Sequence, residues 1–302
     1  MGALMQHFAV AGIQMPVSAF DENLSQMSRY LAHVRHRFPW VDMVLFSELA
    51  AYGPSPAKAE EMPGMAEARL CEMAAKYRLW LVPGSLFERL DGRIYNTSPV
   101  IDPKGNVVAR YRKMFPFLPY EQGISAGIEF VVFDVPHVGR FGVSICYDMW
   151  FPETTRTLVA MGAEVILHPT MTDTIDRDVE LSIARASAAT NQVYFIDING
   201  VGDGGLGRSI VVDPSGYVLH EGGRGTTEII PVEIDFGKVR RERERGLRGL
   251  GQPLKSFRDR EVDFSIYQRG SAAEAYLQSL GKLVKPGATG DTPPLATGPA
   301  GE

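Results

Sequence analysis

Three residues that could act together in nucleophilic catalysis stand where predicted strands end. Glu48 closes the run VDMVLFSE, Lys113 closes NVVARYRK, and Cys146 closes RFGVSIC. In layered α/β proteins, loops diverge at strand ends and leave crevices, so reactive side chains at three such ends could meet. A carboxylate, an ammonium and a thiol make a workable set for nucleophilic catalysis by the thiol.

The thiol needs help before it can attack. With a reference pKa of about 8.5 it is mostly protonated at neutral pH, and Glu48 is the predicted base, provided that desolvation raises the pKa of its carboxyl. Lys113 would favour the thiolate and, together with the backbone N–H of Tyr147, would stabilise the oxygen of a tetrahedral intermediate. Taken singly, each residue has an ordinary explanation, since a free cysteine such as Cys146 is usually a small buried hydrophobe.

The elements that must place these residues alternate between strand and helix. Apolar runs bounded by Gly or Pro predict strands, and apolar residues at helical spacing predict helices. The predicted strands cover residues 7–15, 42–48, 79–87, 129–135, 140–147, 164–168, 193–199 and 226–235. The predicted helices cover residues 21–37, with Asp21 as the cap, 66–77, 152–161, 178–190 and 238–248.

Two further segments, 98–113 and 208–223, carry Asp-Pro-x-Gly between apolar runs. Pro sets φ and Gly accepts the positive φ of the return, so each segment predicts an antiparallel strand pair joined by a tight turn. Antiparallel pairs together with amphipathic helices indicate sheets packed on each other with helices outside. The predicted fold class is therefore a layered α/β sandwich.

Composition narrows the possible partners. The chain has 302 residues, 45% hydrophobic and 22% charged, and its net charge of −5 offers no basic face for nucleic acid. No apolar run approaches the length of a membrane span, and no basic segment precedes an apolar stretch at the N-terminus. Two cysteines cannot form a disulfide framework, so we expect a reducing cytoplasm as the location.

Three blocks then stand in order along the chain: FSELAAYGPS at 46–55, YRKMFPFLPYE at 111–121 and GVSICYDMWFPETTR at 142–156. Together they resemble the nitrilase, or carbon–nitrogen hydrolase, superfamily, and the resemblance runs from about residue 7 to residue 264. It implies a four-layer αββα sandwich with Cys146 as nucleophile, Glu48 as general base, Lys113 at the oxyanion, and Glu121 as a second glutamate near the site. It also implies that no cofactor is required.

The resemblance does not choose one branch of the superfamily. Tyr147-Asp148 stands where true nitrilases typically carry Trp-Glu, which favours an amide over a nitrile. The run CYDMWFPE looks like N-carbamoylputrescine amidase, whereas KMFPFLPYE looks closer to aliphatic amidases and formamidases. The predicted function is hydrolysis of a small aliphatic amide or N-carbamoyl amine through a cysteine thioester, with release of ammonia. The alternatives are an acyltransferase with the same acyl-enzyme, nitrile hydrolysis, and a non-catalytic assembly module.

Several residues adjoin the catalytic blocks and are predicted to form the walls of the substrate pocket. They are Tyr52, Tyr120, Trp150, Thr170 and Met171. Only their nearness in sequence supports this placement. If the substrate were a carbamoyl amino acid, Arg156 could face its carboxylate, or it could equally pair with Glu153.

Other motifs do not support a cofactor or a metal. GDGGLG at 202–207 has the spacing of a dinucleotide-binding loop, but a β-rich run follows it where a helix would be needed, so it predicts a Gly-rich turn. There is no H-E-x-x-H and no paired-cysteine spacing, and His168 is predicted to be satisfied by hydrogen bonds.

Domain organisation and assembly complete the predictions. Residues 1–268 are expected to form the carbon–nitrogen hydrolase domain, and residues 269–302 a C-terminal extension. The extension is expected to be flexible from about residue 285, where Pro, Gly, Thr and Ala leave little to bury. The resemblance also implies a homodimer or a larger homo-oligomer, with contacts expected at 238–248 and 257–267.

Overall fold

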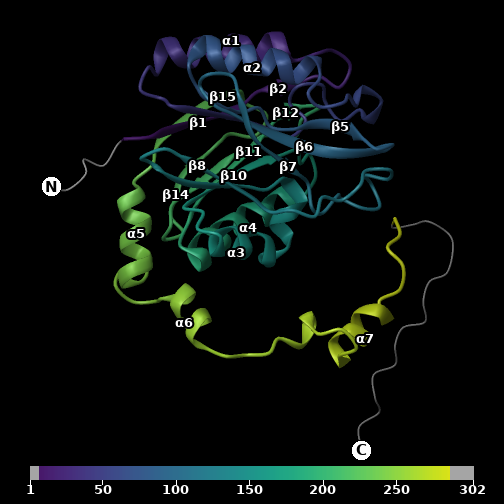
Figure 1. Cartoon of the computed structure of the whole chain (residues 1–302), viewed down its shortest axis with the longest axis vertical. Coiled ribbons are helices and arrows are strands. Elements are labelled where there is room, and N and C mark those ends of the chain that lie inside the picture. Colours follow the sequence, from purple (N-terminus) through teal and green to yellow (C-terminus); the bar gives the residue numbers. More distant parts are fainter. Residues whose placement is uncertain (1–6, 286–302) are drawn as a thin grey trace, which may run out of the picture.

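Strands that are buried on both faces dominate the centre of the computed structural model, which describes residues 7–285. Every residue is buried in β1 (Ala9–Gln14), β3 (Met43–Phe46), β10 (Val165–Thr170) and β11 (Tyr194–Asn199). Such strands need cover on both sides. Two sheets therefore lie face to face, and helices cover the outer face of each (Figure 1).

The first sheet joins the N-terminal half of the chain to one later strand. Its order is β15 (Glu228–Glu233), β1, β3, β4 (Trp80–Val82), β6 (Arg93–Ile101) and β5 (Leu86–Leu90), with β7 (Val107–Arg112) also paired to β6. Strands β1, β3 and β4 run parallel, and the other pairings are antiparallel. Helices α1 (Leu24–Arg37) and α2 (Met65–Tyr77) cover its outer face (Figure 1).

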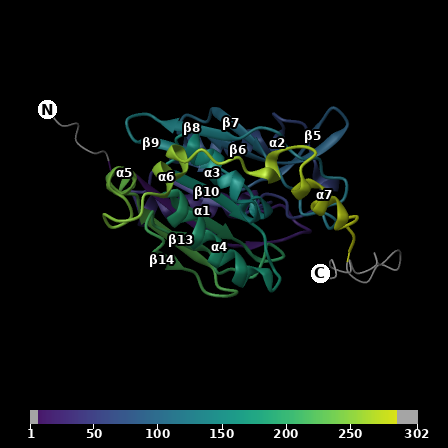
Figure 2. The same cartoon turned by 90° about the horizontal axis from the view of Figure 1, so that it is seen from below.

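The second sheet has the order β14 (Val218–Glu221), β13 (Ile210–Val212), β11, β10, β9 (Gly139–Val143) and β8 (Val131–Val135). Strands β9, β10 and β11 are parallel, and antiparallel pairs flank them. Helices α3 (Pro152–Ala160) and α4 (Asp176–Asn191) lie on its outer face (Figures 1 and 2). A short separate pair joins β2 (Pro16–Val17) to β12 (Val201–Gly202).

Three apolar layers hold this stack together. The layer between the sheets includes Leu45, Val143 and Leu167. The layer under α1 and α2 includes Met27, Phe46 and Leu70. The layer under α3 and α4 includes Leu158, Leu181 and Phe195. Burial of this apolar surface is the main favourable contribution to folding. The four-layer αββα sandwich is thus confirmed, as are both hairpins.

The single strand predicted over 79–87 is interrupted at residues 83–85, which lie between β4 and β5, and both parts pair antiparallel with β6. Gly84, within this interruption, has φ +79°, and a Cβ there would lie 1.7 Å from the Ser47 carbonyl oxygen. The predicted cap of α1 is also wrong: the helix begins at Leu24, after Asn23, whose side chain accepts from the Ser18 amide. The chain at 202–207 turns without entering a helix, as expected.

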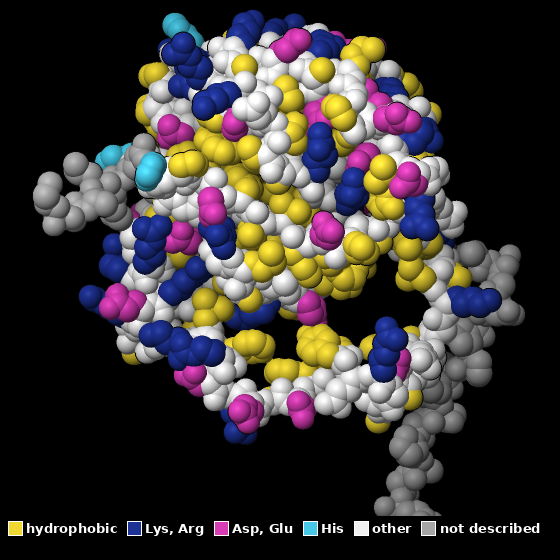
Figure 3. All heavy atoms as spheres, in the orientation of Figure 1, with side chains coloured by type: hydrophobic (Ala, Val, Ile, Leu, Met, Phe, Trp, Pro, Cys, Tyr) yellow, Lys and Arg dark blue, Asp and Glu magenta, His cyan; other side chains and the backbone are white. Residues whose placement is uncertain are grey.

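The C-terminal part leaves the layers. Helix α5 (Phe236–Arg245) ends at Gly246, earlier than the predicted end at 248. Beyond it lies an arm that passes below α3 and α4 (Figures 1 and 2). The arm consists of α6 (Pro253–Asp259), a 3-10 turn η3 (Ser265–Tyr267) and α7 (Ala272–Ser279), none of which was predicted. In Figure 3 hydrophobic side chains gather along the lower edge of the body and on this arm.

The segment beyond residue 285, which was expected to be flexible, lies outside the described residues. Within 7–285, no helix combines the length and the apolarity that crossing a membrane would require.

Candidate active site

Cys146 lies at a strained turn shortly after β9, a strand of the second sheet. Strand β9 ends at Val143, so the predicted strand over 140–147 is too long, and Cys146 opens the 3-10 turn η2 (Cys146–Trp150) with φ +46°. Positive φ is costly for a residue with a Cβ, and such strain is often found at functional sites. The thiol is nearly buried, 4.0 Å from the Met171 carbonyl oxygen and 3.9 Å from the Thr172 hydroxyl.

Glu48 and Lys113 meet beside this thiol, as their strand-end positions predict. Lys113 follows β7, and its ammonium donates to the Glu48 carboxylate at 2.8 Å, with both side chains 1% exposed. The Asn96 side-chain amide donates to the same Glu48 oxygen at 2.7 Å. The Glu48 amide donates across to the carbonyl of Thr170, at the end of β10. The two sheets together therefore fix the position of Glu48.

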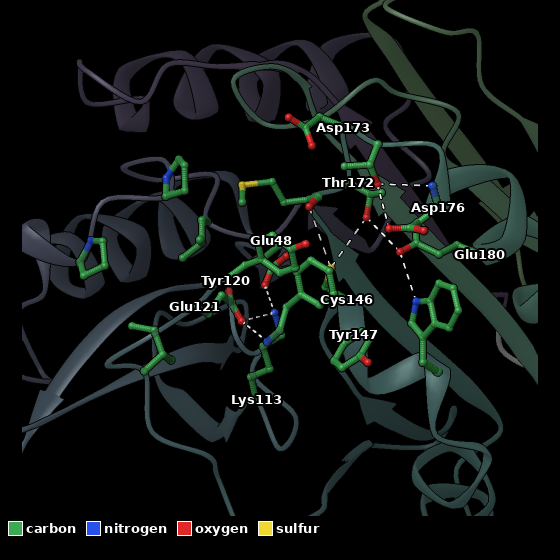
Figure 4. Close-up of a pocket in the computed structure, with 18 of the residues that line it drawn as sticks. Glu48, Lys113, Tyr120, Glu121, Cys146, Tyr147, Thr172, Asp173, Asp176 and Glu180 are labelled. Atoms are coloured by element: carbon green, nitrogen blue, oxygen red, sulfur yellow. Dashed lines mark hydrogen bonds and ion pairs between the residues drawn. The ribbon is translucent and has the colours of Figure 1, made fainter. Parts of the chain in front are cut away.

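Glu121 completes this charged group from the loop after β7. Its carboxylate accepts from the Lys113 ammonium at 3.0 Å and from the Phe117 amide at 2.6 Å. Lys113 is thus held between two carboxylates (Figure 4). A buried ammonium with two acidic partners stays charged and oriented.

Burial and mutual charge perturb the pKa values of this group. Burial raises the pKa of the Glu48 carboxyl, and the Lys113 charge opposes that rise. Burial also disfavours the charged form of Lys113, but the charges of Glu48, the Cys146 thiolate and Glu121 prevail and lift its pKa well above 10.5. Burial, reinforced by the Glu48 charge, raises the pKa of the Cys146 thiol. The resting group is therefore a thiol beside a carboxylate that is basic enough to accept its proton.

Asp148 supports the turn from within, a role that sequence patterns did not indicate. Its carboxylate accepts from the Tyr111 hydroxyl at 2.6 Å and from the amides of Ile145 and Phe115 at 2.8 and 2.9 Å. Burial raises its pKa to about 6. These bonds connect the loop after Lys113 to the turn that carries Cys146.

His168 supports the same turn from β10. Its ring contacts the Ser144 hydroxyl at 2.7 Å and the Cys146 carbonyl oxygen at 3.1 Å. Burial lowers its pKa to about 4, so the ring is neutral near pH 7 and can donate to that carbonyl. The expectation that hydrogen bonds satisfy His168 is confirmed. Among the residues from 7 to 285, no group of three or more His, Cys, Asp or Glu is placed to hold a metal ion.

A cavity of about 690 Å³ opens over the thiol. Of the five predicted wall residues, Tyr120, Trp150 and Met171 line it, and so does Tyr147. Tyr52 does not, because it packs against the apolar layer under α1 and α2. Thr170 is also absent from the walls: it is fully buried and contributes its carbonyl to the Glu48 amide.

Arg156 does not line the cavity either, and it does not pair with Glu153. Its guanidinium lies over the Phe257 ring at 5.4 Å, and Glu153 instead accepts from the Tyr267 hydroxyl. Both partners come from the C-terminal arm. Neither suggested role of Arg156 is found, because no sequence pattern indicated that this arm would pass beside α3.

The wall facing Glu48 was not predicted. It comes from the segment after β10 and from the first turns of α4, and it contains Thr172, Asp173, Thr174, Asp176 and Glu180 (Figure 4). These residues carry no recognisable spacing in the sequence. Their nearness to Cys146 depends on where α4 packs.

Comparison with known proteins agrees with this arrangement. The family model described as carbon–nitrogen hydrolase matches residues 9–244. The omega-amidase of Mus musculus is 29% identical over 255 residues, covering 78% of this chain and 91% of that protein. A formamidase of Bacillus cereus is 27% identical over 244 residues, covering 75% of this chain and 74% of that protein.

A solved structure extends the likeness to three dimensions. It is a mutant of the amidase from Nesterenkonia sp. AN1, showing the result of Michael addition of acrylamide at the active-site cysteine. This chain matches it with a TM-score of 0.70 and 25% identity, over 80% of this chain and 99% of that one. The similarity thus covers most of the layered sandwich.

Proposed function

The chain belongs to the carbon–nitrogen hydrolase family, and from that premise we propose that it hydrolyses a small aliphatic amide or an N-carbamoyl amine. Cys146 acts as the nucleophile, and the reaction releases ammonia. The observation that carries the proposal is the buried contact of Lys113 with Glu48 and Glu121 beside the thiol, in the wall of a cavity of suitable size. The names of the amidase relatives support the same reaction class.

The first half of the reaction forms a thioester. Glu48 takes the proton of the Cys146 thiol, and the sulfur bonds to the amide carbon. The carbonyl oxygen becomes an oxyanion, stabilised by the Lys113 ammonium and the Tyr147 N–H. When the carbon–nitrogen bond breaks, Glu48 returns the proton to the nitrogen, and ammonia leaves.

The second half consumes the thioester. Glu48, again a carboxylate, takes a proton from water, and the hydroxide oxygen bonds to the acyl carbon. The carbon–sulfur bond breaks, the proton returns to the Cys146 thiolate, and the carboxylic acid departs. Glu121 holds Lys113 in place throughout, because its carboxylate is the second acceptor of that ammonium.

Ammonia release from a panel of substrates tests this proposal. The panel contains aliphatic amides, formamide, N-carbamoyl amines, N-carbamoyl amino acids and nitriles, with Cys146→Ala as the inactive variant and Cys71→Ala as the matched cysteine control. We expect turnover of an amide class that Cys146→Ala loses and Cys71→Ala keeps. Turnover of nitriles alone would refute the amidase, and transfer to added hydroxylamine faster than hydrolysis would favour an acyltransferase.

We also propose that the protein is a cytoplasmic homo-oligomer. A reducing compartment keeps a nucleophilic thiol active, and both cysteines of the described chain are free. Apolar side chains of the C-terminal arm are exposed, among them Phe257, Phe264 and Tyr276 at 54%, 47% and 67%, and such surface is typical of a subunit contact. Light scattering on the full chain tests the assembly, and a monomer mass would refute it.

A further inference from the structure

The wall of the cavity opposite Lys113 is acidic. Glu180, Asp173 and Asp176 line it together with the Trp150 ring, while Glu48, Lys113 and Glu121 lie on the other side of Cys146 (Figure 4). Asp173 is exposed and Asp176 half-buried, but Glu180 is buried. Of the three carboxylates, Glu180 is thus the one least screened by water.

Glu180 lies close enough to the nucleophile for a substrate bound to Cys146 to reach it. Its carboxylate accepts from the Thr172 hydroxyl at 3.0 Å, and that hydroxyl is 3.9 Å from the Cys146 sulfur. The carboxylate and the sulfur are therefore no more than about 7 Å apart. Asn199 fixes Thr172 by bonding its backbone amide and carbonyl, so this distance is set by the fold.

The negative charge of Glu180 is not cancelled locally. Its ion-pair partner, Arg177, donates to Glu180 at 3.0 Å but also to Asp197 at 2.8 Å, and all three side chains are nearly buried. Two carboxylates share one guanidinium, so this buried group keeps a net charge of −1 when both are ionised. A cation placed in the cavity would balance that charge.

Among residues 7–285, no unengaged cation lines the cavity. Five carboxylates and one cationic side chain, Lys113, line it in the described part of the chain, and Lys113 is bound by Glu48 and Glu121. The Lys285 ammonium lies over the Tyr120 ring, 5.2 Å from its centroid, but is not part of the cavity wall. An anionic substrate would therefore enter without a partner for its charge.

We propose that Glu180 is a specificity-determining residue that makes the cavity prefer amides with an ammonium at the far end of a short aliphatic chain over amides with a carboxylate there. The inference rests on the proposed amidase function and names its substrate class. The amide carbon lies at Cys146, and the ammonium lies toward Glu180, where the Trp150 ring, whose N–H is 3.5 Å from that carboxylate, adds an aromatic wall.

Three amides of matched length test this preference: 4-aminobutanamide is cationic, pentanamide is neutral and succinamate is anionic. We expect kcat/KM to fall in that order, with the cationic amide at least about tenfold better than the anionic one, as one charge interaction at this range allows. Glu180→Gln keeps the shape and leaves Arg177 paired with Asp197. In this variant the cationic-to-anionic ratio is expected to fall at least about tenfold.

A matched control tests whether the effect depends on where the negative charge is removed or only on the change in net charge. Glu72→Gln changes net charge equally at an exposed site outside the cavity, so the ratio should stay at its wild-type value. Equal use of succinamate and 4-aminobutanamide by the wild-type protein would overturn the inference while leaving the amidase intact. An unchanged ratio in Glu180→Gln would overturn the role of Glu180.

Binding measurements distinguish this outcome from failure of the amidase itself. In Cys146→Ala protein, which cannot form the thioester, calorimetric titration with the three amides measures the charge preference without turnover. We expect the cationic amide to bind at least about tenfold more tightly than succinamate. Tighter binding of succinamate would refute the inference even if the wild-type protein hydrolysed none of the three amides.

Discussion

Replacing Lys113 by methionine removes the one cation that Glu48 and Glu121 share. The ammonium is 1% exposed and donates to both carboxylates at 2.8 and 3.0 Å. Methionine fills a similar volume but offers no donor, so two acidic groups would face each other beside the buried Cys146 thiol. The change therefore tests whether this charged group is as tightly coupled as its geometry indicates.

The expected cost is large. Removing one partner of a buried ion pair typically destabilises a protein by about 3–5 kcal/mol, because the remaining charge is buried without compensation. In Lys113→Met the Glu48 carboxyl loses the ammonium that opposes protonation, so its folded-state pKa, already raised by burial, rises further. An acid with a raised folded-state pKa favours folding at low pH and loses that contribution as pH rises through the folded pKa. The penalty should thus be smaller at low pH than at pH 7.

Urea unfolding at pH 7 of the wild type, Lys113→Met, Glu48→Gln and the double variant measures this coupling. The double variant should be more stable than Lys113→Met alone by about 1–3 kcal/mol, because one uncompensated carboxylate is gone. Lys104→Met, at an exposed site, serves as the control and should change stability by about 0.5 kcal/mol or less. A cost below about 1 kcal/mol for Lys113→Met, typical of a surface pair, would refute the argument.

Two further predictions concern the residues that hold the Cys146 turn. The folded-state pKa of His168 is about 4, below its ordinary 6.5, so the unfolded chain binds the extra proton as pH falls between these values. As the pH falls over this range, the free energy of unfolding of the wild type should decrease by up to about 3 kcal/mol, and that of His168→Gln should decrease distinctly less. Urea unfolding at a series of pH values measures this difference. If both proteins lost stability equally with falling pH, the His168 ring would not be buried and neutral. Asp148→Ala leaves the Tyr111 hydroxyl and two backbone amides without their acceptor and should cost about 3 kcal/mol or more. Asp134→Ala, which breaks an exposed pair with Arg140, should leave stability nearly unchanged, and similar costs for the two variants would contradict the role of Asp148.

The strand before Glu48 could be predicted from its apolar run, and the strand before Lys113 from the Asp-Pro-x-Gly turn that pairs it with the preceding strand. Their convergence followed from the general behaviour of strand ends in layered folds. Cys146 was located in sequence, but its turn was not, because the Ser-Ile-Cys continuation of β9 looks as apolar as a strand. The Asp148 carboxylate, which accepts from the Ile145 amide, and the His168 ring, which contacts the Cys146 carbonyl, hold the chain where it leaves the sheet.

The walls of the cavity were harder to predict. Tyr52 and Thr170 are adjacent in sequence to a catalytic block or a strand end, yet the Tyr52 side chain packs under the helices and the Thr170 side chain is fully buried. Glu180 lies outside the three catalytic blocks, and its place beside Thr172 depends on the packing of α4 against β11 and η2. Nearness along the chain is therefore a poor guide to a wall built from a helix of a different layer.

The central claim, that Cys146 carries the acyl group during amide hydrolysis, is tested most directly by rapid acid quenching of the protein during turnover, followed by mass spectrometry of its peptides. We predict a mass increase equal to the acyl group on the peptide that contains Cys146, none on the peptide that contains Cys71, and loss of both the adduct and ammonia release in Cys146→Ala. Continued ammonia release by Cys146→Ala at the wild-type rate would contradict the account.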